Sequence, residues 1–186
     1  MWYVIQVKTG EENGIARKLK NQAIRAEVPI ENRPIRSGGA WTKKEYILFP
    51  GYVFLDMDFT ARNYYRVKEV PGVIRFLGDS KAPSTLSYLE AEWIRILSGN
   101  GEPLEPTMVR EDGSGGITVI SGVLKQLENR VLKWDKRSRK ATFEITICGE
   151  ARQVQLGIEV EGGGELQEAG SDASQNAAQP LLQDAT

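Results

Sequence analysis

Leu48-Phe49-Pro50-Gly51-Tyr52-Val53-Phe54, residues 48–54, is a dense aromatic segment between two strand-like runs, 41–49 and 52–57. Its Pro-Gly pair predicts a tight turn between the two strands. Because successive side chains of a strand point to opposite faces, only some of the large side chains can enter one core. Two interpretations follow. Either all of them pack against neighbouring helices, or some form an exposed aromatic patch that binds a protein partner.

Outward from this turn, residues 1–104 alternate between strand and helix patterns. Further strand-like runs lie at 2–7 and 73–77, and 26–35 suits an edge strand or an irregular arm. Thr9, Thr60 and Ser87 can each cap a helix. Thr9 and Ser87 are each followed three positions later by a glutamate, as in a capping box. The last helix is expected to bury Leu89, Trp93, Ile96 and Leu97. This order of elements predicts a ferredoxin-like α/β sandwich.

The chain changes character after residue 104. Residues 105–113 belong to a stretch rich in Gly, Pro and acidic residues and are expected to form a linker. Short strand-like runs follow at 117–121, 130–135, 141–148 and 152–156, which predicts a small SH3-like β-barrel over 114–161. Residues 162–186 contain no Lys or Arg and four Asp or Glu, and we expect a disordered acidic tail. The predicted fold class is therefore α+β.

The composition argues against several classes of protein. The 186 residues include no histidine, which removes the usual general base and a common metal ligand. No motif places another base beside a nucleophile and no set of metal ligands is clustered, so we expect no enzyme, no metal and no cofactor. The single cysteine, Cys148, cannot form an internal disulfide. No run approaches the roughly 20 apolar residues that span a bilayer, so we expect a cytoplasmic protein without membrane contact.

Basic side chains gather at the predicted tip of one barrel hairpin. Residues 123–152 contain eight Lys or Arg and four Asp or Glu. Basic turns are often only solvated, but such a tip can also meet a phosphate backbone, with Trp134 as a nearby stacking surface. Strand alternation can turn Arg139 toward the barrel instead. The candidate RNA-binding residues are Arg130, Lys133, Lys136, Arg137, Arg139 and Lys140.

Several segments resemble the NusG family of transcription elongation factors, in which a ferredoxin-like N-terminal (NGN) domain precedes a barrel with the KOW motif. The resemblance covers residues 1–161. It implies that the protein binds the clamp helices of RNA polymerase through Phe49, Pro50, Gly51 and Tyr52, and bridges the polymerase cleft near the DNA. We expect it to act as a monomer. The matching segments are Trp2-Tyr3-Val4-Ile5-Gln6, Phe49-Pro50-Gly51-Tyr52-Val53, Val70-Pro71-Gly72-Val73, Ser121-Gly122-Val123-Leu124, 131–135 and 149–154.

Cys148 stands where general members tend to carry an exposed phenylalanine that contacts Rho or a ribosomal protein, which argues against those contacts. The very basic hairpin tip and the segment Gly-Glu-Ala-Arg-Gln-Val-Gln-Leu-Gly-Ile-Glu-Val, residues 149–160, resemble the specialised LoaP branch of this family. This resemblance implies antitermination, with recruitment by an RNA hairpin in the nascent leader transcript. The alternative is a general NusG protein that couples polymerase to Rho or the ribosome through protein contacts of its KOW domain. Other specialised branches, such as the RfaH-like proteins, are further alternatives.

Overall fold

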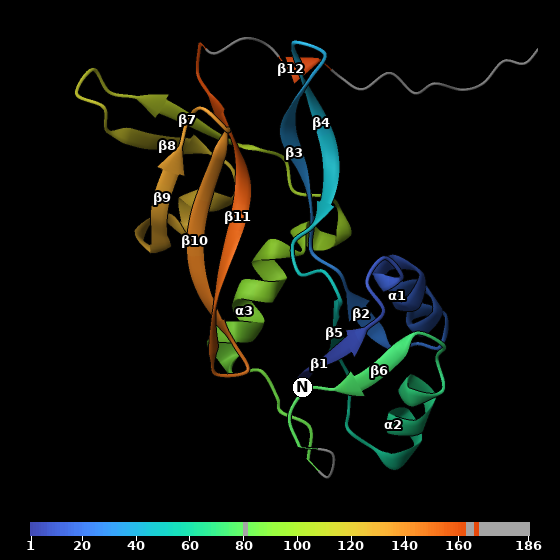
Figure 1. Ribbon diagram of the computed structural model, residues 1–186. Coiled ribbons are helices and arrows are strands. Elements are labelled where there is room, and N and C mark those ends of the chain that lie inside the picture. The colour runs from blue at the N-terminus through green and yellow to red at the C-terminus, as the bar shows by residue number, and fades with distance from the viewer. Residues whose placement is uncertain (80–81, 163–165, 168–186) are drawn as a thin grey trace, which may run out of the picture.

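The computed structural model describes residues 1–79, 82–162 and 166–167 (Figure 1). Most of the predicted tail therefore lies outside the described residues. The helices are α1 (Glu12–Asn21), α2 (Ala61–Lys68) and α3 (Tyr88–Leu97). The strands of the N-terminal part are β1 (Trp2–Val7), β2 (Arg25–Glu27), β3 (Ile30–Ser37), β4 (Ala40–Ile47), β5 (Tyr52–Asp56) and β6 (Val73–Phe76). Those that follow are β7 (Thr107–Glu111), β8 (Ile117–Ser121), β9 (Val131–Asp135), β10 (Lys140–Ile147), β11 (Glu150–Val160) and β12 (Leu166–Gln167).

The N-terminal sheet has the strand order β2-β5-β1-β6 and is covered on both faces. Alternation along β1 explains this arrangement, since Tyr3, Ile5 and Val7 pack with α1 and α2 whereas Trp2 and Val4 face the opposite side. The opposite side is covered by α3 and by the C-terminal sheet. In Figure 1, α3 lies between the two sheets. The mixture of helices and sheets agrees with the predicted class.

Two of the three predicted helix caps form. The Thr60 hydroxyl accepts the Asn63 backbone N–H at 3.1 Å, and Ser87 and Glu90 form a complete capping box. The predicted Thr9 cap is wrong, because α1 is capped at Glu11, whose side chain makes no capping hydrogen bond. The carboxylate of Glu12 is used elsewhere, as described below.

The inward face of α3 also differs from the prediction in part. Leu97 is buried as expected, but Leu89 is 51 % exposed. The helix instead turns Glu90, Ala91 and Ile94 inward, because Glu90 both caps the helix and reaches the C-terminal sheet. A carboxylate at a mostly apolar helix face is invisible to a pattern that counts only hydrophobic residues.

Strands β3 and β4 form a long hairpin that projects from the N-terminal sheet and lies beside β11 (Figure 1). The extended stretch predicted at 26–35 is thus divided between β2 and β3. Strand β12 pairs in parallel with β4, where Leu166 lies opposite Trp41. The chain therefore returns from the C-terminal sheet to the N-terminal hairpin.

The C-terminal sheet has the strand order β8-β7-β11-β10-β9. Within the stretch 105–113, residues Thr107–Glu111 form β7, which pairs in parallel with β11 and antiparallel with β8. The acidic and glycine-rich sequence that suggested a linker belongs mostly to the β7–β8 loop, where the Asp112 side chain accepts hydrogen bonds from the backbone N–H groups of Ser114 and Gly116. No helix in the described part of the chain is long and apolar enough to cross a membrane.

One hydrophobic cluster runs through both parts of the molecule. It joins Trp2, Phe54 and Ile94 of the N-terminal part to Phe143 and Leu156 of the C-terminal sheet. Buried apolar area stabilises at about 25 cal/mol per Å², so a shared cluster favours the packed arrangement of the two parts. The sequence alone had left open whether they pack together.

Candidate functional site

The aromatic turn between β4 and β5 is held by backbone and carboxylate hydrogen bonds. Gly51 adopts a φ of 83°, which favours glycine, and a Cβ there would lie 3.3 Å from the Thr9 hydroxyl. The Gly51 N–H donates to the Glu12 carboxylate at 2.7 Å, and its carbonyl accepts the Val7 N–H at 2.8 Å. Glu12 is 1 % exposed and also accepts the Gly10 N–H at 2.7 Å. The turn is therefore preorganised by α1.

The residues of this turn divide between the core and the surface. Phe49 is 7 % exposed and packs edge-to-face on Phe54, with ring centroids 5.3 Å apart. Pro50 is exposed and Tyr52 is half-buried. Phe49 therefore packs inward, whereas Pro50 and Tyr52 reach the surface.

A pocket of about 180 Å³ opens beside the turn. One side is apolar and comes from the N-terminal part: Val4, Leu48, Phe49, Pro50, Tyr52, Phe54 and Leu77. The other side is supplied by the adjoining ends of β10 and β11: Ile147, Arg152, Gln153 and Val154. The Arg152 guanidinium lies 6.0 Å from the centroid of the Tyr52 ring. The C-terminal sheet thus covers part of the aromatic surface.

The six basic residues predicted to bind RNA have different surroundings. Two of them lie on tryptophans of the N-terminal part: Arg130 is 4.6 Å from the ring centroid of Trp93, and Arg139 is 4.2 Å from that of Trp41. Arg139 is only 5 % exposed and adopts a φ of 51°. Arg139 is thus buried, but it lies in the turn between β9 and β10 rather than in a strand, and it packs on Trp41 of the β3–β4 hairpin.

The other four basic residues lie nearer to solvent. Lys136 forms an ion pair with Glu111, Lys133 and Arg137 are exposed, and Lys140 is half-buried. The structure therefore separates two cations that join the parts of the molecule from four that remain near the surface. The sequence pattern did not reveal Trp93 as the partner of Arg130 or Trp41 as the partner of Arg139, because each tryptophan is far from its arginine along the chain.

Two buried carboxylates connect the parts of the molecule. Glu31 of β3 is 2 % exposed, forms an ion pair with Arg33 and accepts the Gly157 N–H of β11 at 2.7 Å. Burial raises the pKa of Glu31, although Arg33 and this hydrogen bond act in the opposite direction. Burial also acts to raise the pKa of Glu90, but hydrogen bonds from Gly149 and Ser87 outweigh it and hold that pKa below its usual value.

Cys148 lies at the turn between β10 and β11, beside Glu90. Burial raises the pKa of its thiol, and the nearby carboxylates of Glu90 and Glu150 act in the same direction. Thiolate character, which nucleophilic cysteines need, is therefore disfavoured. Within the described residues, no group of three or more His, Cys, Asp or Glu side chains could hold a metal ion.

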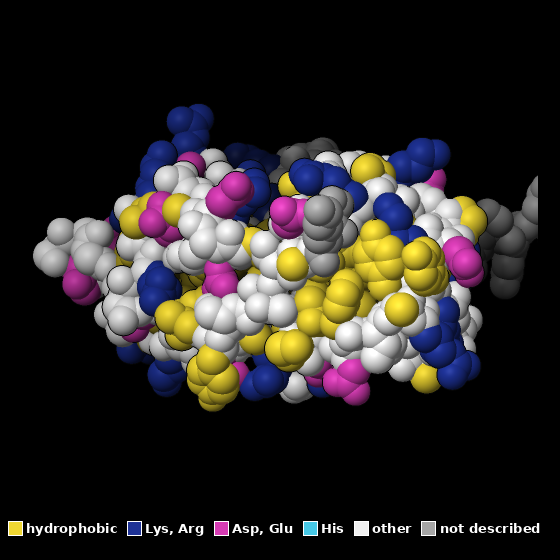
Figure 2. Space-filling model, turned by 90° about the horizontal axis from the view of Figure 1, so that it is seen from below, with side chains coloured by type: hydrophobic (Ala, Val, Ile, Leu, Met, Phe, Trp, Pro, Cys, Tyr) yellow, Lys and Arg dark blue, Asp and Glu magenta, His cyan; other side chains and the backbone are white. Residues whose placement is uncertain are grey.

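Figure 2 shows hydrophobic side chains gathered on the underside of the molecule, over the part that carries α2 and β6. Exposed large side chains in this part include Phe59, Tyr65 and Ile74. Phe59 and Tyr64 also join an aromatic cluster with Tyr3 and Phe76. Tyr3 and Phe76 are distant along the chain from Phe59 and from each other, so no local sequence pattern predicts this cluster.

Comparison with known proteins identifies the family. The NusG family model, described as transcription termination factor nusG, matches residues 1–95. The transcription termination/antitermination protein NusG of Helicobacter pylori strain J99 is 28% identical over 165 residues, covering 83% of this chain and 93% of that protein. The protein of the same name from Buchnera aphidicola is 28% identical over 166 residues, with 83% and 91% covered. A solved structure titled "Domain interaction in Thermotoga maritima NusG" matches 84% of this chain and 93% of that chain, with a TM-score of 0.52 and 23% identity. The chain therefore belongs to the NusG family of transcription termination factors.

Proposed function

We propose that the protein is a transcription elongation and antitermination factor that binds RNA polymerase through its N-terminal part. In this proposal residues 1–104 act as an NGN domain, and a KOW barrel begins at β7. A protein that binds the processive state of the polymerase clamp more tightly than the open state shifts the population toward it without chemistry of its own. The names of the related proteins, which include antitermination, support this class of function.

The observation that carries the proposal is the apolar pocket beside the aromatic turn. Helices with an apolar face bind in hydrophobic grooves, and aromatic side chains are frequent anchors of such contacts. Tyr52 is half-buried and Pro50 is exposed, so both are accessible to a partner, whereas Phe49 supports the pocket from beneath. We assign this surface to the clamp helices of polymerase.

The packed C-terminal sheet competes with this contact. Ile147, Gln153 and Val154 line the same pocket as Tyr52. A clamp helix that used the whole aromatic surface would have to displace these side chains. Polymerase binding and separation of the two parts are therefore coupled in the proposed mechanism.

We propose that recruitment uses a hairpin in the nascent RNA, as in the LoaP branch. The exposed or half-buried cations Lys133, Arg137 and Lys140 provide the phosphate contacts. Arg130 and Arg139 are assigned to packing between the two parts. The alternative, a general coupling factor, would use the turn at Cys148 for protein contacts. The adjacent Gly149 is hydrogen-bonded to Glu90, which engages that turn within the molecule.

The test is binding of the Tyr52→Ala variant to an isolated clamp-helix fragment of RNA polymerase. Truncation of an aromatic anchor typically costs about 2 kcal/mol, which corresponds to a roughly 30-fold loss of affinity. Tyr65→Ala is the matched control, because Tyr65 is 61% exposed on α2 and does not line the pocket. Equal affinity of the two variants, both with a native circular dichroism spectrum, would remove the aromatic turn from the polymerase contact.

A further inference from the structure

A groove runs between the β3–β4 hairpin and the turn that joins β9 to β10. The hairpin supplies Pro34, Ile35, Arg36 and Trp41. Its opposite wall includes Arg137 and Lys140 of the C-terminal sheet. The volume of the groove is about 350 Å³. Neither part of the molecule forms this groove alone.

The charge of the groove is positive. Arg36 and Arg137 are exposed and Lys140 is half-buried, and no carboxylate is among the described residues that line it. Within the described part of the chain, none of these three cations forms an ion pair. Lys140 is near enough to the carboxylates of Glu31 and Asp135 to act to lower their pKa values, so Arg36 and Arg137 are the cations of the groove most available to an anionic ligand.

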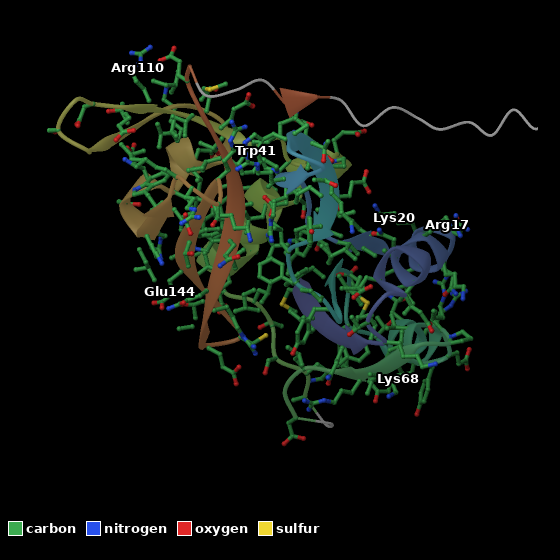
Figure 3. The ribbon with its side chains drawn as sticks, turned by 45° about the horizontal axis from the view of Figure 1, so that its top comes forward. Arg17, Lys20, Trp41, Lys68, Arg110 and Glu144 are labelled. Atoms are coloured by element: carbon green, nitrogen blue, oxygen red, sulfur yellow. The ribbon has the colours of Figure 1, made fainter. Side chains whose placement is uncertain are left out.

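The uncharged surface of the groove is apolar and partly aromatic. Trp41 is half-buried, and the Arg139 guanidinium lies 4.2 Å from its ring centroid. This cation–π contact restrains the indole, so part of an aromatic surface is available in a fixed position. Figure 3 shows Trp41 where the β3–β4 hairpin meets β11. A restrained aromatic ring with several cations nearby suits a nucleobase and its neighbouring phosphates.

We propose that this groove binds unpaired RNA. The RNA site then includes the β3–β4 hairpin as well as the turn that joins β9 to β10. Arg36, Arg137 and Lys140 contact phosphates, and Trp41 provides an apolar surface for a base. The inference rests on the proposed function, in which the protein binds nascent RNA. It extends that function to Arg36, a residue outside the basic run of the barrel.

The test uses the full-length protein and a fluorescein-labelled oligouridylate of about 12 nucleotides, a length typical of small single-strand sites. Affinity is measured by anisotropy across a salt series for Arg36→Ala, Arg137→Ala and Arg36→Lys. Each alanine variant is expected to weaken binding and to reduce the salt slope by about 0.7, the value for one phosphate contact in a single strand. The lysine variant keeps the charge and should retain the slope.

Arg17→Ala is the matched control, because Arg17 is an exposed arginine of α1, away from Trp41 (Figure 3). If Arg137→Ala weakened binding while Arg36→Ala behaved like Arg17→Ala, the groove would be ruled out and RNA binding by the barrel would remain. If neither alanine variant had an effect, RNA recognition by this region would fail as well. The polymerase contact is tested separately through Tyr52. Equally tight binding of polyglutamate, with the same dependence on Arg36, would overturn the assignment to RNA.

Discussion

Glu90 uses its two carboxylate oxygens for two different parts of the molecule. Oε2 accepts the Ser87 backbone N–H at 2.7 Å and completes the cap of α3, whereas Oε1 accepts the Gly149 N–H of the β10–β11 turn at 3.0 Å. The Ser87 hydroxyl accepts the Glu90 N–H at 3.3 Å. One side chain therefore stabilises a helix terminus and the packing of the two parts.

Glu90→Ala is predicted to accelerate hydrogen exchange at the Gly149 amide. Hydrogen bonds to charged groups contribute about 1.5 to 3 kcal/mol, so their loss corresponds to roughly tenfold faster exchange or more. Ser87→Ala is the control, because it weakens the same helix cap without removing the acceptor of Gly149. Amide exchange measured by NMR distinguishes the two variants. Similar exchange at Gly149 in both would show that this hydrogen bond does not hold the turn.

The raised pKa of Glu31 predicts a specific dependence of stability on pH. When the folded pKa lies above the unfolded value, the folded state binds more protons between the two values, so stability falls as pH rises through that interval. The groups that face Glu31 are Arg33, Lys140 and the Gly157 N–H. Glu31→Gln is predicted to remove this fall, which begins near the ordinary glutamate pKa of 4.5.

The Glu31 effect is measured from urea unfolding midpoints across the acidic range. Glu45→Gln is the control, because Glu45 is an exposed glutamate of the adjacent strand β4. Its curve should parallel that of the unmodified protein. The assignment to Glu31 fails if Glu31→Gln retains the same slope. The comparison uses slopes because the substitution also alters the hydrogen bonds to Arg33 and Gly157.

Local sequence patterns predicted the turn at Pro50-Gly51, the caps at Thr60 and Ser87, and most of the strands. These features depend on neighbouring residues, which a pattern can read. The pairings of Glu31 with Gly157 and of Arg139 with Trp41 join segments that are distant in sequence, so no periodicity encodes them. Contacts between distant segments also explain why the basic residues at 130–140 were predicted to form a single RNA-binding tip. The sequence does not show that Arg130 and Arg139 pack on tryptophans of the N-terminal part.

Gly157→Ala is predicted to loosen the packing of β11 on β3. A Cβ at this position would lie 2.5 Å from Cδ of Pro34. Such overpacking typically costs about 1 to 3 kcal/mol. Because the C-terminal sheet covers part of the pocket beside Tyr52, the variant should also bind the clamp-helix fragment more tightly than the unmodified protein does.

Gly113→Ala is the control for Gly157→Ala, because a Cβ at Gly113 meets no atom within 4 Å. Thermal unfolding and clamp-helix affinity are measured for both variants. If Gly157→Ala lowered stability but left the affinity unchanged, the packed arrangement would not compete with polymerase. If neither quantity changed, β3 and β11 would accommodate the methyl group without separating.

Arg139→Ala is predicted to destabilise the packed arrangement and to leave the salt slope of RNA binding nearly unchanged. Arg139 is buried on Trp41, and a cation–π contact of this kind contributes about 0.5 to 2 kcal/mol. Arginine and alanine both have a Cβ, so the backbone φ of 51° costs each of them a similar amount. The difference in stability between Arg139 and the alanine variant therefore reports mainly on the arginine side chain.

Arg137→Ala provides the opposite pattern, because Arg137 is exposed. Its stability should change little, while the salt slope falls by about 0.7. Urea unfolding and RNA titration of both variants check the assignment. A loss of about 0.7 from the slope in Arg139→Ala, with stability unchanged, would return Arg139 to the RNA-binding surface.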